Sequence, residues 1–312
     1  MPDWKLNTPI AFIVFNRPQT ARAVFEQIRA ARPPQLLVIA DGPRRDRPSE
    51  AQLCATTRAI LDGVDWPCDV QANFSDRNLG CRERVASGID WVFSQVPEAI
   101  ILEDDCLPHP SFFRFCAELL ERYRDDQRVG MISGTNLQAL AGRGDASYYF
   151  SKYTSVWGWA TWRRAWARYD RSASIWPELL GSAAFRSMTE PGERIYWQRA
   201  FTGVHRGAID TWDYQWTLTS WCESMLSIVP SHNLISNIGF GPDATHTTQA
   251  GAYANLSTAA MAFPLSHPRL ILADTEADAS VAATAFNEPL RSRVRRYLTL
   301  APRPSGWAAR NR

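Results

Sequence analysis

Several common nucleotide-binding signatures are missing from this chain of 312 residues. No Gly-x-Gly-x-x-Gly follows the first apolar segment, which argues against a nicotinamide or flavin dinucleotide as the ligand. No Gly-Lys-Ser/Thr follows a glycine-rich loop either, so the sequence holds no P-loop phosphate site. The six cysteines include no Cys-x-x-Cys pair, and we interpret them as buried thiols in a reducing compartment.

The chain also lacks a strong charge of one sign and long apolar runs. A formal net charge of +2 gives no overall footprint for nucleic acid, so we expect no nucleic-acid partner. No window approaches the roughly 18 apolar residues that predict a membrane-spanning helix. The first five residues do not have the layout of a signal peptide. The sequence therefore predicts a cytoplasmic protein.

Short apolar segments alternate with amphipathic segments in the first 133 residues. The apolar segments predict strands at 10–15, 36–40, 70–74, 99–102 and 129–132, and the amphipathic ones predict helices at 20–31, 49–61, 81–96 and 110–123. Strands that alternate with helices of this length indicate βαβ units with right-handed crossovers. We therefore expect an α/β fold with a mainly parallel, Rossmann-like sheet flanked by helices.

The alternation changes after Gly134. The sequence predicts strands at 148–150 and 226–229, helices at 193–205 and 212–223, and a loop at 233–241. No linker separates the two halves, so we expect the second half to lie on the same sheet. This divides the chain into a nucleotide-binding half at 1–133, an acceptor-binding and catalytic half at 134–250, and a C-terminal extension at 251–312.

The most informative stretch joins an apolar strand to three consecutive acids. Ala99 to Leu102 is apolar throughout, and Glu103, Asp104 and Asp105 follow directly. In open α/β sheets ligands bind at the carboxyl ends of the strands, which is where these acids fall. A divalent cation would relieve their mutual repulsion, and hard oxygen ligands suit Mg²⁺ or Mn²⁺. A polar turn after a strand is the alternative interpretation.

These motifs, in their order, resemble the GT-A glycosyltransferases, specifically the inverting family 2-like enzymes. The Glu-Asp-Asp variant followed by Pro-x-Phe-Phe is similar to the N-acetylglucosaminyltransferase type that begins complex N-glycans. The matching positions are Asn16-Arg17, Asp41-Gly42, Asn78-x-Gly80, Glu103-Asp104-Asp105, Pro110-Ser111-Phe112-Phe113, Trp212-Asp213 and His246. The chain lacks the Gly-Glu-Asp that many family 2 members carry.

The resemblance implies a metal site that holds a diphosphate. We expect Asp105 to bind Mn²⁺ or Mg²⁺ directly, because a cation stabilises the charge that grows on the diphosphate leaving group. Asp104 is a second ligand or holds the ribose hydroxyls, and Glu103 orients the pair. His246 is a further metal ligand, unless it is only a histidine of a surface loop.

The resemblance also implies a nucleoside side before the acids. Asn16 and Arg17 follow the first strand, and Arg17 is placed to neutralise phosphate or to contact the base. Asp41 is expected to accept a hydrogen bond from the base, although Asp-Gly-Pro forms a turn without any ligand. Asn78 and Gly80 let the backbone approach the nucleotide, and a loop without a ligand is the alternative.

The acceptor side is expected after the acids. Inverting transfer needs one carboxylate to take the proton of the acceptor hydroxyl, and we assign Asp213 to this role. The alternative is an acid that the helix dipole favours, with Asp210 equally able to cap the same helix. Trp157, Trp159 and Trp212 are expected to stack on sugars, and burial in the core is the alternative for each.

The predicted function is metal-dependent transfer of a sugar, with inversion, from a nucleoside-diphosphate sugar to a glycan or lipid-linked hydroxyl. The donor is expected to be UDP-linked, and cell-surface polysaccharide or lipopolysaccharide assembly fits such an acceptor. The alternatives are a sugar-phosphate nucleotidyltransferase, disfavoured by Asn16-Arg17-Pro18, and a non-catalytic glycan-binding or scaffold protein. Residues 287–312 hold seven arginines and one acid, which predicts peripheral membrane contact or a solvated terminus.

Overall fold

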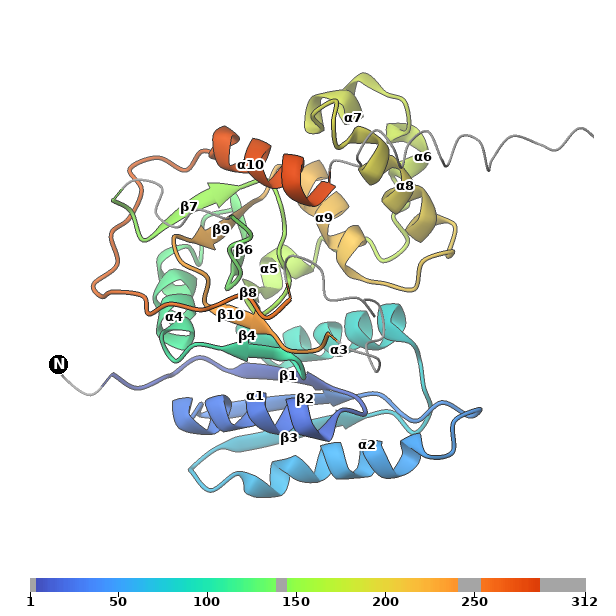
Figure 1. The fold of residues 1–312 in the computed structure, drawn as a ribbon, viewed down its shortest axis with the longest axis vertical. Coiled ribbons are helices and arrows are strands. Elements are labelled where there is room, and N and C mark those ends of the chain that lie inside the picture. Colours follow the sequence, from blue (N-terminus) through green and yellow to red (C-terminus); the bar gives the residue numbers. More distant parts are fainter. Residues whose placement is uncertain (1–3, 139–144, 241–253, 287–312) are drawn as a thin grey trace, which may run out of the picture.

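The computed structural model describes residues 4–138, 145–240 and 254–286. Their centre is an eight-stranded sheet of order β3-β2-β1-β4-β8-β6-β9-β7, whose strands ascend Figure 1 from β3 to β7. The strands are β1 (Ile10–Val14), β2 (Gln35–Ala40), β3 (Asp69–Phe74), β4 (Glu98–Glu103), β6 (Val129–Ser133), β7 (Tyr148–Ser151), β8 (Trp159–Trp162) and β9 (Leu226–Pro230).

The direction of the strands divides the sheet into two parts. β1, β2, β3 and β4 are all parallel, as buried apolar strands joined by helices should be. β8 is antiparallel to both β4 and β6, β9 is parallel to β6, and β7 is antiparallel to β9. The prediction of an α/β fold with a mainly parallel sheet, and of a second half on that sheet, is confirmed.

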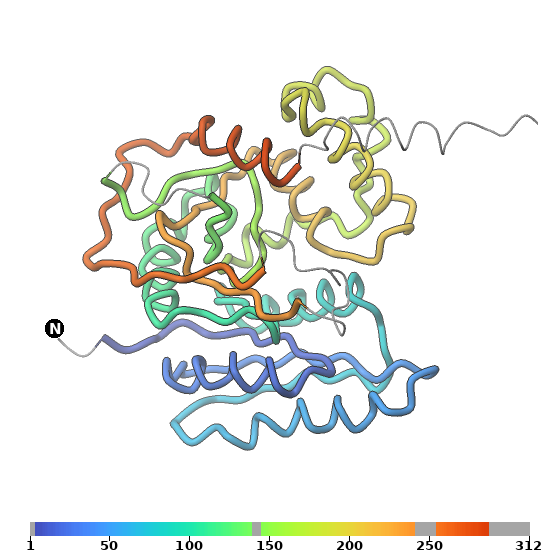
Figure 2. The backbone as a smooth tube through the Cα atoms, in the orientation of Figure 1, coloured from blue at the N-terminus to red at the C-terminus, as the bar shows by residue number. Residues whose placement is uncertain are grey.

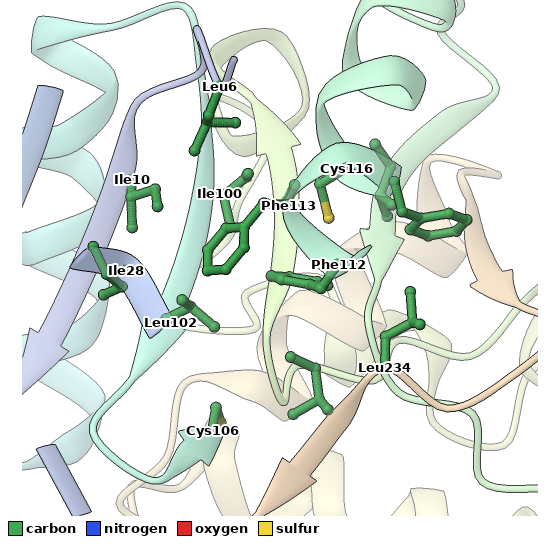
Figure 3. Close-up of a cluster of buried hydrophobic side chains, with 14 of the residues drawn as sticks. Leu6, Ile10, Ile28, Ile100, Leu102, Cys106, Phe112, Phe113, Cys116 and Leu234 are labelled. Atoms are coloured by element: carbon green, nitrogen blue, oxygen red, sulfur yellow. The ribbon is translucent and has the colours of Figure 1, made fainter. Parts of the chain in front are cut away.

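One face of the sheet is covered by α1 (Pro18–Ala31) and α4 (Ser111–Arg122). Proline at the start of α1 suits a helix N-terminus, and Arg32 ends that helix in the left-handed conformation. Phe112 and Phe113 of α4 pack with Ile100 and Leu102 of β4 (Figure 3). This core anchors the strand that carries the acids.

The other face is covered by α3 (Cys81–Gln95), α5 (Arg163–Trp166) and α9 (Asp213–Cys222). Residues of β1 alternate between the two cores, since Phe12 packs against the first group of helices and Ile13 against the second. This face holds four buried tryptophans: Trp159, Trp166, Trp212 and Trp216.

A third, smaller core lies on the outer side of α9. It is built from α6 (Trp176–Leu179), α7 (Ala183–Met188) and α8 (Arg194–His205), which Figure 1 shows grouped away from β1, β2 and β3. α10 (Thr275–Val281) and the short π-helix η2 (Ala282–Phe286) add to it, and the tube in Figure 2 shows α10 crossing above β7. The last elements are α2 (Glu50–Arg58) and the 3-10 helix η1 (Ala59–Gly63), next to α1.

One strand was missed by the sequence prediction, and one expectation about local structure was wrong. The stretch 157–164 contains strand β8, which was not predicted because its four residues are all buried and show no alternation. The expected loop at 233–241 contains β10 (Ile235–Asn237), which pairs antiparallel with β5 (Cys106–Pro108), the strand that directly follows the acids. In the described ranges, no helix is long and apolar enough to cross a membrane.

Candidate functional site

The three acids lie at the carboxyl edge of the sheet, next to the turn that follows β1. The backbone N–H of Phe15 donates a hydrogen bond of 2.9 Å to Asp104 Oδ2. Arg17 Nη1 donates one of 2.7 Å to Asp105 Oδ2 and lies 3.8 Å from Asp104 Oδ1. The parallel pairing of β1 with β4 produces this contact, because it aligns the ends of the two strands. Arg17 therefore pairs with the acids in this structure. Its expected contact with phosphate or with the base stays a prediction.

The acids carry more negative charge than their surroundings balance. Burial, followed by the charges of Asp105, Asp104 and Asp213, raises the pKa of Glu103 to about 8. Burial and Asp105 raise the pKa of Asp104 to about 7, although Arg17 acts in the opposite direction. Close carboxylates that one guanidinium does not neutralise form a site that favours a further cation.

The donor set at this edge suits a hard divalent cation held together with a substrate. Among the described residues, no group of three or more His, Cys, Asp and Glu side chains gathers as a metal cluster. Mg²⁺ is commonly bound by one or two carboxylates together with substrate phosphates and water, rather than by a complete protein cage. Asp105 and Asp104 fit that arrangement. His246 lies outside the described residues, so its assignment stays a prediction.

Segment 237–239 lies directly against the acids, which sequence reasoning missed. Ile238 N donates a hydrogen bond of 2.8 Å to the carbonyl oxygen of Asp105, and this contact continues the pairing of β5 with β10. A Cβ built on Gly239 would lie 2.1 Å from Asp105 Oδ2, so only glycine fits there. The signal in the sequence was a single glycine in an expected loop, which predicts no particular neighbour.

Asp41 braces two loops at the ends of β2 and β3. It is 6% exposed, and its carboxylate accepts hydrogen bonds from Gly42 N, Leu79 N and the side-chain amide of Asn78. Burial raises its pKa, while the bonds from Leu79 and Gly42 lower it. Both carboxylate oxygens accept hydrogen bonds within the chain, so Asp41 and Asn78 hold these two loops together. Their expected contact with the nucleotide stays a prediction. Asn16 is half-buried in the bend after β1.

A cavity of about 480 Å³ opens beside this brace. Arginines dominate its walls, which are Arg44, Arg45, Asp46, Arg77, Asn78 and Leu79. The guanidinium of Arg44 is paired with Glu50 and lies 5.5 Å from the ring centroid of Phe15. The sequence analysis did not single out these arginines, although they flank the Asp41-Gly42 and Asn78-x-Gly80 motifs. The lining of the cavity therefore gives this edge of the sheet an excess of positive charge.

Residue 80 has to be glycine, because a carboxylate from the second half of the chain leaves no room for a Cβ there. Its φ of 81° lies in the region that glycine tolerates best, and a Cβ there would lie 2.7 Å from Asp210 Oδ2. Asp210 accepts hydrogen bonds of 3.1 Å from Cys81 N and Arg82 N. Asp210 therefore caps the start of α3, and the expectation that it could cap the helix at 213 was wrong.

Asp213 reaches the same edge as the acids. It begins α9, is half-buried, and accepts a hydrogen bond from the hydroxyl of Thr211. Its charge helps to raise the pKa of Glu103, as stated above, and also that of Cys81, after burial and Glu103. The start of α3, the end of β4 and the start of α9 thus converge at one place.

The tryptophans expected to stack on sugars divide into two groups. Trp159 is 0% and Trp212 is 2% exposed, and their rings stack on each other at 5.5 Å between centroids. Rings buried in this way present no face to a sugar, so both belong to the core. Trp157 is half-buried just before β8, and its ring contacts that of Phe240. Of the three, Trp157 is the one that is not buried in the core.

Comparisons with known proteins find only weak similarity to solved structures, with low TM-scores and low sequence identity. No family model matches the chain, and no curated protein matches it significantly. A UDP-glucose pyrophosphorylase complexed with UDP-glucose is 10% identical, with 72% of this chain and 90% of that chain covered, at a TM-score of 0.34. The apo form of a UDP-glucose pyrophosphorylase is also 10% identical, with 71% and 90% covered, at 0.35.

A third solved structure is the 4-diphosphocytidyl-2C-methyl-D-erythritol synthase of Anaerococcus prevotii. It is 10% identical, with 62% of this chain and 84% of that chain covered, at a TM-score of 0.29. None of these three structures is named as a glycosyltransferase, and their names belong to the nucleotidyltransferase alternative of the sequence analysis. Likenesses this weak assign no activity to the chain.

Proposed function

We propose that this protein is an enzyme that acts on a nucleoside-diphosphate sugar, and that it transfers the sugar to a hydroxyl acceptor. One observation carries the proposal. Glu103 ends β4, Asp104 and Asp105 follow it at the carboxyl edge of the sheet, and Asp213 enters the same electrostatic environment from α9. Glycosyl transfer requires a stabilised diphosphate leaving group and a general base. The acidic cluster, which favours a bound cation, suits the first, and the separate half-buried carboxylate suits the second.

The donor would lie across the ends of β1, β2 and β4. The arginine-lined cavity beside Asp41 would take the nucleoside, and a UDP-linked donor is our proposal for its identity. The diphosphate would lie near Arg17 and Asp105, where Mn²⁺ or Mg²⁺ supplies charge that stabilises the leaving group. Arg17 forms an ion pair with Asp105, so donor binding would redistribute this pair.

The acceptor would approach from the side of Trp157 and Asp213. Asp213 would take the proton from the acceptor hydroxyl as that oxygen attacks the anomeric carbon. The bond from the anomeric carbon to the diphosphate breaks on the opposite face, and the diphosphate leaves with the electron pair, so the configuration inverts. We propose a glycan or lipid-linked acceptor of cell-surface polysaccharide or lipopolysaccharide assembly, reached on the cytoplasmic side of the membrane.

Sugar-phosphate nucleotidyl transfer is the second candidate, because it uses the same class of ligand. It needs no general base for an acceptor hydroxyl, so the position of Asp213 favours glycosyl transfer. The short turn Asn16-Arg17-Pro18, which leads straight into α1, also lacks the glycine-rich signature expected of that class.

The test measures release of nucleotide from a panel of UDP-, GDP- and TDP-sugars with Mn²⁺, with and without glycan acceptors. Asp105→Asn should reduce metal-dependent turnover by roughly 10²-fold or more. Asp125→Asn should not, because Asp125 is exposed and precedes β6, at the opposite edge of the sheet from the acids. Formation of a sugar nucleotide from a nucleoside triphosphate and a sugar phosphate would identify the second candidate. Nucleotide binding without turnover in any assay would identify a non-catalytic glycan-binding or scaffold protein.

A further inference from the structure

A second cavity lies away from the acids, between the helical group and the sheet. Its volume is about 340 Å³. Its walls include Lys152 after β7, Met188 at the end of α7, Ser220 and Trp221 near the end of α9, and Asp278 of α10. Four separate elements thus contribute to one enclosure, which is within the range of about 300–1,000 Å³ typical of small-molecule sites.

The cavity belongs to the opposite edge of the sheet from the acids. β9 runs in the same direction as β4, because β9 is parallel to β6, and β6 and β4 are both antiparallel to β8. The acids follow the end of β4, whereas Leu226, in the wall of the cavity, begins β9. α9 carries Asp213 at its start and Ser220 seven residues later, about 10 Å along its axis. The cavity is therefore separate from the proposed donor site.

One wall of the cavity contains a buried polar group without a partner. Ser220 is 2% exposed, and among the described residues its Oγ forms no hydrogen bond. A buried hydroxyl without a partner costs about 1–3 kcal/mol, so such groups usually have a ligand or a water. The unused hydroxyl and the cavity together indicate a place for a hydroxyl-bearing ligand.

The remaining walls combine fixed charges with apolar surface. Lys152 Nζ donates to Glu193 Oε1 at 2.7 Å and to the carbonyl of Met188 at 3.0 Å, so the ammonium is held in place. Asp278 is 6% exposed and accepts hydrogen bonds from the Ser151 hydroxyl and from Lys152 N. Apolar walls come from residues such as Met188, Trp221, Met225, Leu226 and Ala273. The charged side chains of the lining are Lys152, Glu190 and Asp278, so its net charge is negative and a phosphorylated ligand would be repelled.

We propose that this cavity binds one neutral sugar unit. A sugar combines hydroxyls, which suit Ser220, Lys152 and Asp278, with C–H faces, which suit partly exposed apolar walls such as Met188 and Leu226. The unit is either a free monosaccharide or one residue of a longer glycan. The proposal does not depend on transferase activity, because its readout is binding at a site remote from Asp213.

The test uses saturation-transfer NMR with glucose, galactose, mannose and N-acetylglucosamine, each also as its methyl glycoside. UDP and Mg²⁺ are present at saturation, so that the proposed nucleotide site is occupied by ligands that leave the sugar signals sharp. Ala279, an exposed residue of α10, lines the cavity, whereas its exposed neighbour Ser280 does not. Ala279→Trp should therefore weaken binding about tenfold or more by filling the space, and the matched Ser280→Trp should leave it unchanged.

Ser220→Ala gives a second measure, which does not depend on how a large side chain is accommodated. It should weaken binding severalfold while the melting temperature is kept or raised, since it removes a buried hydroxyl without a partner. Binding of the methyl glycosides would identify a glycan residue as the ligand, and binding of the free sugars alone would identify a monosaccharide. The proposal is overturned if no sugar binds, or if binding persists equally in Ala279→Trp and Ser220→Ala.

Discussion

Two buried acidic regions of this protein differ in how their negative charge is compensated. Glu193, in the helical group, is 0% exposed and receives hydrogen bonds from Lys152 Nζ, Tyr153 Oη, Trp197 Nε1 and Glu190 N. The acids after β4 instead crowd one another, share Arg17, and have raised pKa values at Glu103 and Asp104.

The difference is the one expected between a structural carboxylate and the acids of the proposed metal site. Four donors compensate the desolvation of Glu193, so that side chain fixes the packing of α8 against the segment after β7. At the acidic edge, the shortage of donors is a cost to the folded state that a bound cation would remove. Removal of the first kind of acid should therefore harm stability, and removal of the second kind should harm activity.

The largest stability effect is expected for Glu193→Ala. Because it leaves Lys152 and several donors without their partner, the free energy of unfolding should fall by about 3–5 kcal/mol. Urea denaturation followed by tryptophan fluorescence measures this. The exposed acid Glu178 provides a matched control, and Glu178→Ala should change stability by less than about 0.5 kcal/mol. A loss below about 1 kcal/mol for Glu193→Ala would mean that its donors find water instead.

The largest effect on activity with an intact fold is expected for Asp213→Asn. Loss of the base should lower the transfer rate roughly 10²–10³-fold, while donor binding measured by calorimetry is retained. Asp125→Asn is again the control. Full transfer activity in Asp213→Asn would show that another group takes the acceptor proton.

Glu103→Gln should change how stability depends on pH. Burial and the neighbouring acids raise the pKa of Glu103 from about 4.5 to about 8, so the folded chain holds a proton that the unfolded chain releases. The wild-type protein should therefore lose stability between these two pH values. Without metal, the variant should lose less, with a gain on the order of 2 kcal/mol at the upper end. If the stability of the two proteins depends on pH in the same way, Glu103 does not interact with the neighbouring acids as proposed.

The smallest effect is expected for Asp210→Ala, which removes the cap of α3. Loss of hydrogen bonds to two helix N–H groups should cost about 1 kcal/mol in unfolding free energy. Asp76→Ala, in an exposed bend two residues after β3, should cost less than about 0.5 kcal/mol. Equal effects of the two substitutions would mean that water replaces the cap fully.

Elements with a clear periodicity were predicted within a few residues. α1 and α3 were predictable because each buries one stripe of apolar residues, and β1 and β2 because both of their faces are buried. β8 was missed, since its Trp-rich run has neither period. β5 and β10 were missed because each is only three residues long and is stabilised by its partner.

The acids of the site could be found from local sequence, but their partners could not. The position of Glu103 to Asp105 followed from the end of one apolar run. The hydrogen bond from Phe15 to Asp104 spans 89 residues, and the bond from Cys81 to Asp210 spans 129. Such contacts depend on the order of strands in the sheet, which no local pattern contains. The burial of Trp159 and Trp212 depends on it in the same way.

The sequence by itself was enough to predict an α/β sheet with three acids at the carboxyl end of β4, because hydrophobic periodicity and strand ends are short-range properties of the chain. The packed structure decided which charges meet there. In the folded chain, Arg17 pairs with the acids and Asp41 accepts hydrogen bonds from the loop after β3. Asp210 caps α3, and Asp213 lies at the same edge as the acids. The reason is that electrostatic and hydrogen-bond energies depend on distance in space, and the packing of β1, β4, α3 and α9 sets those distances.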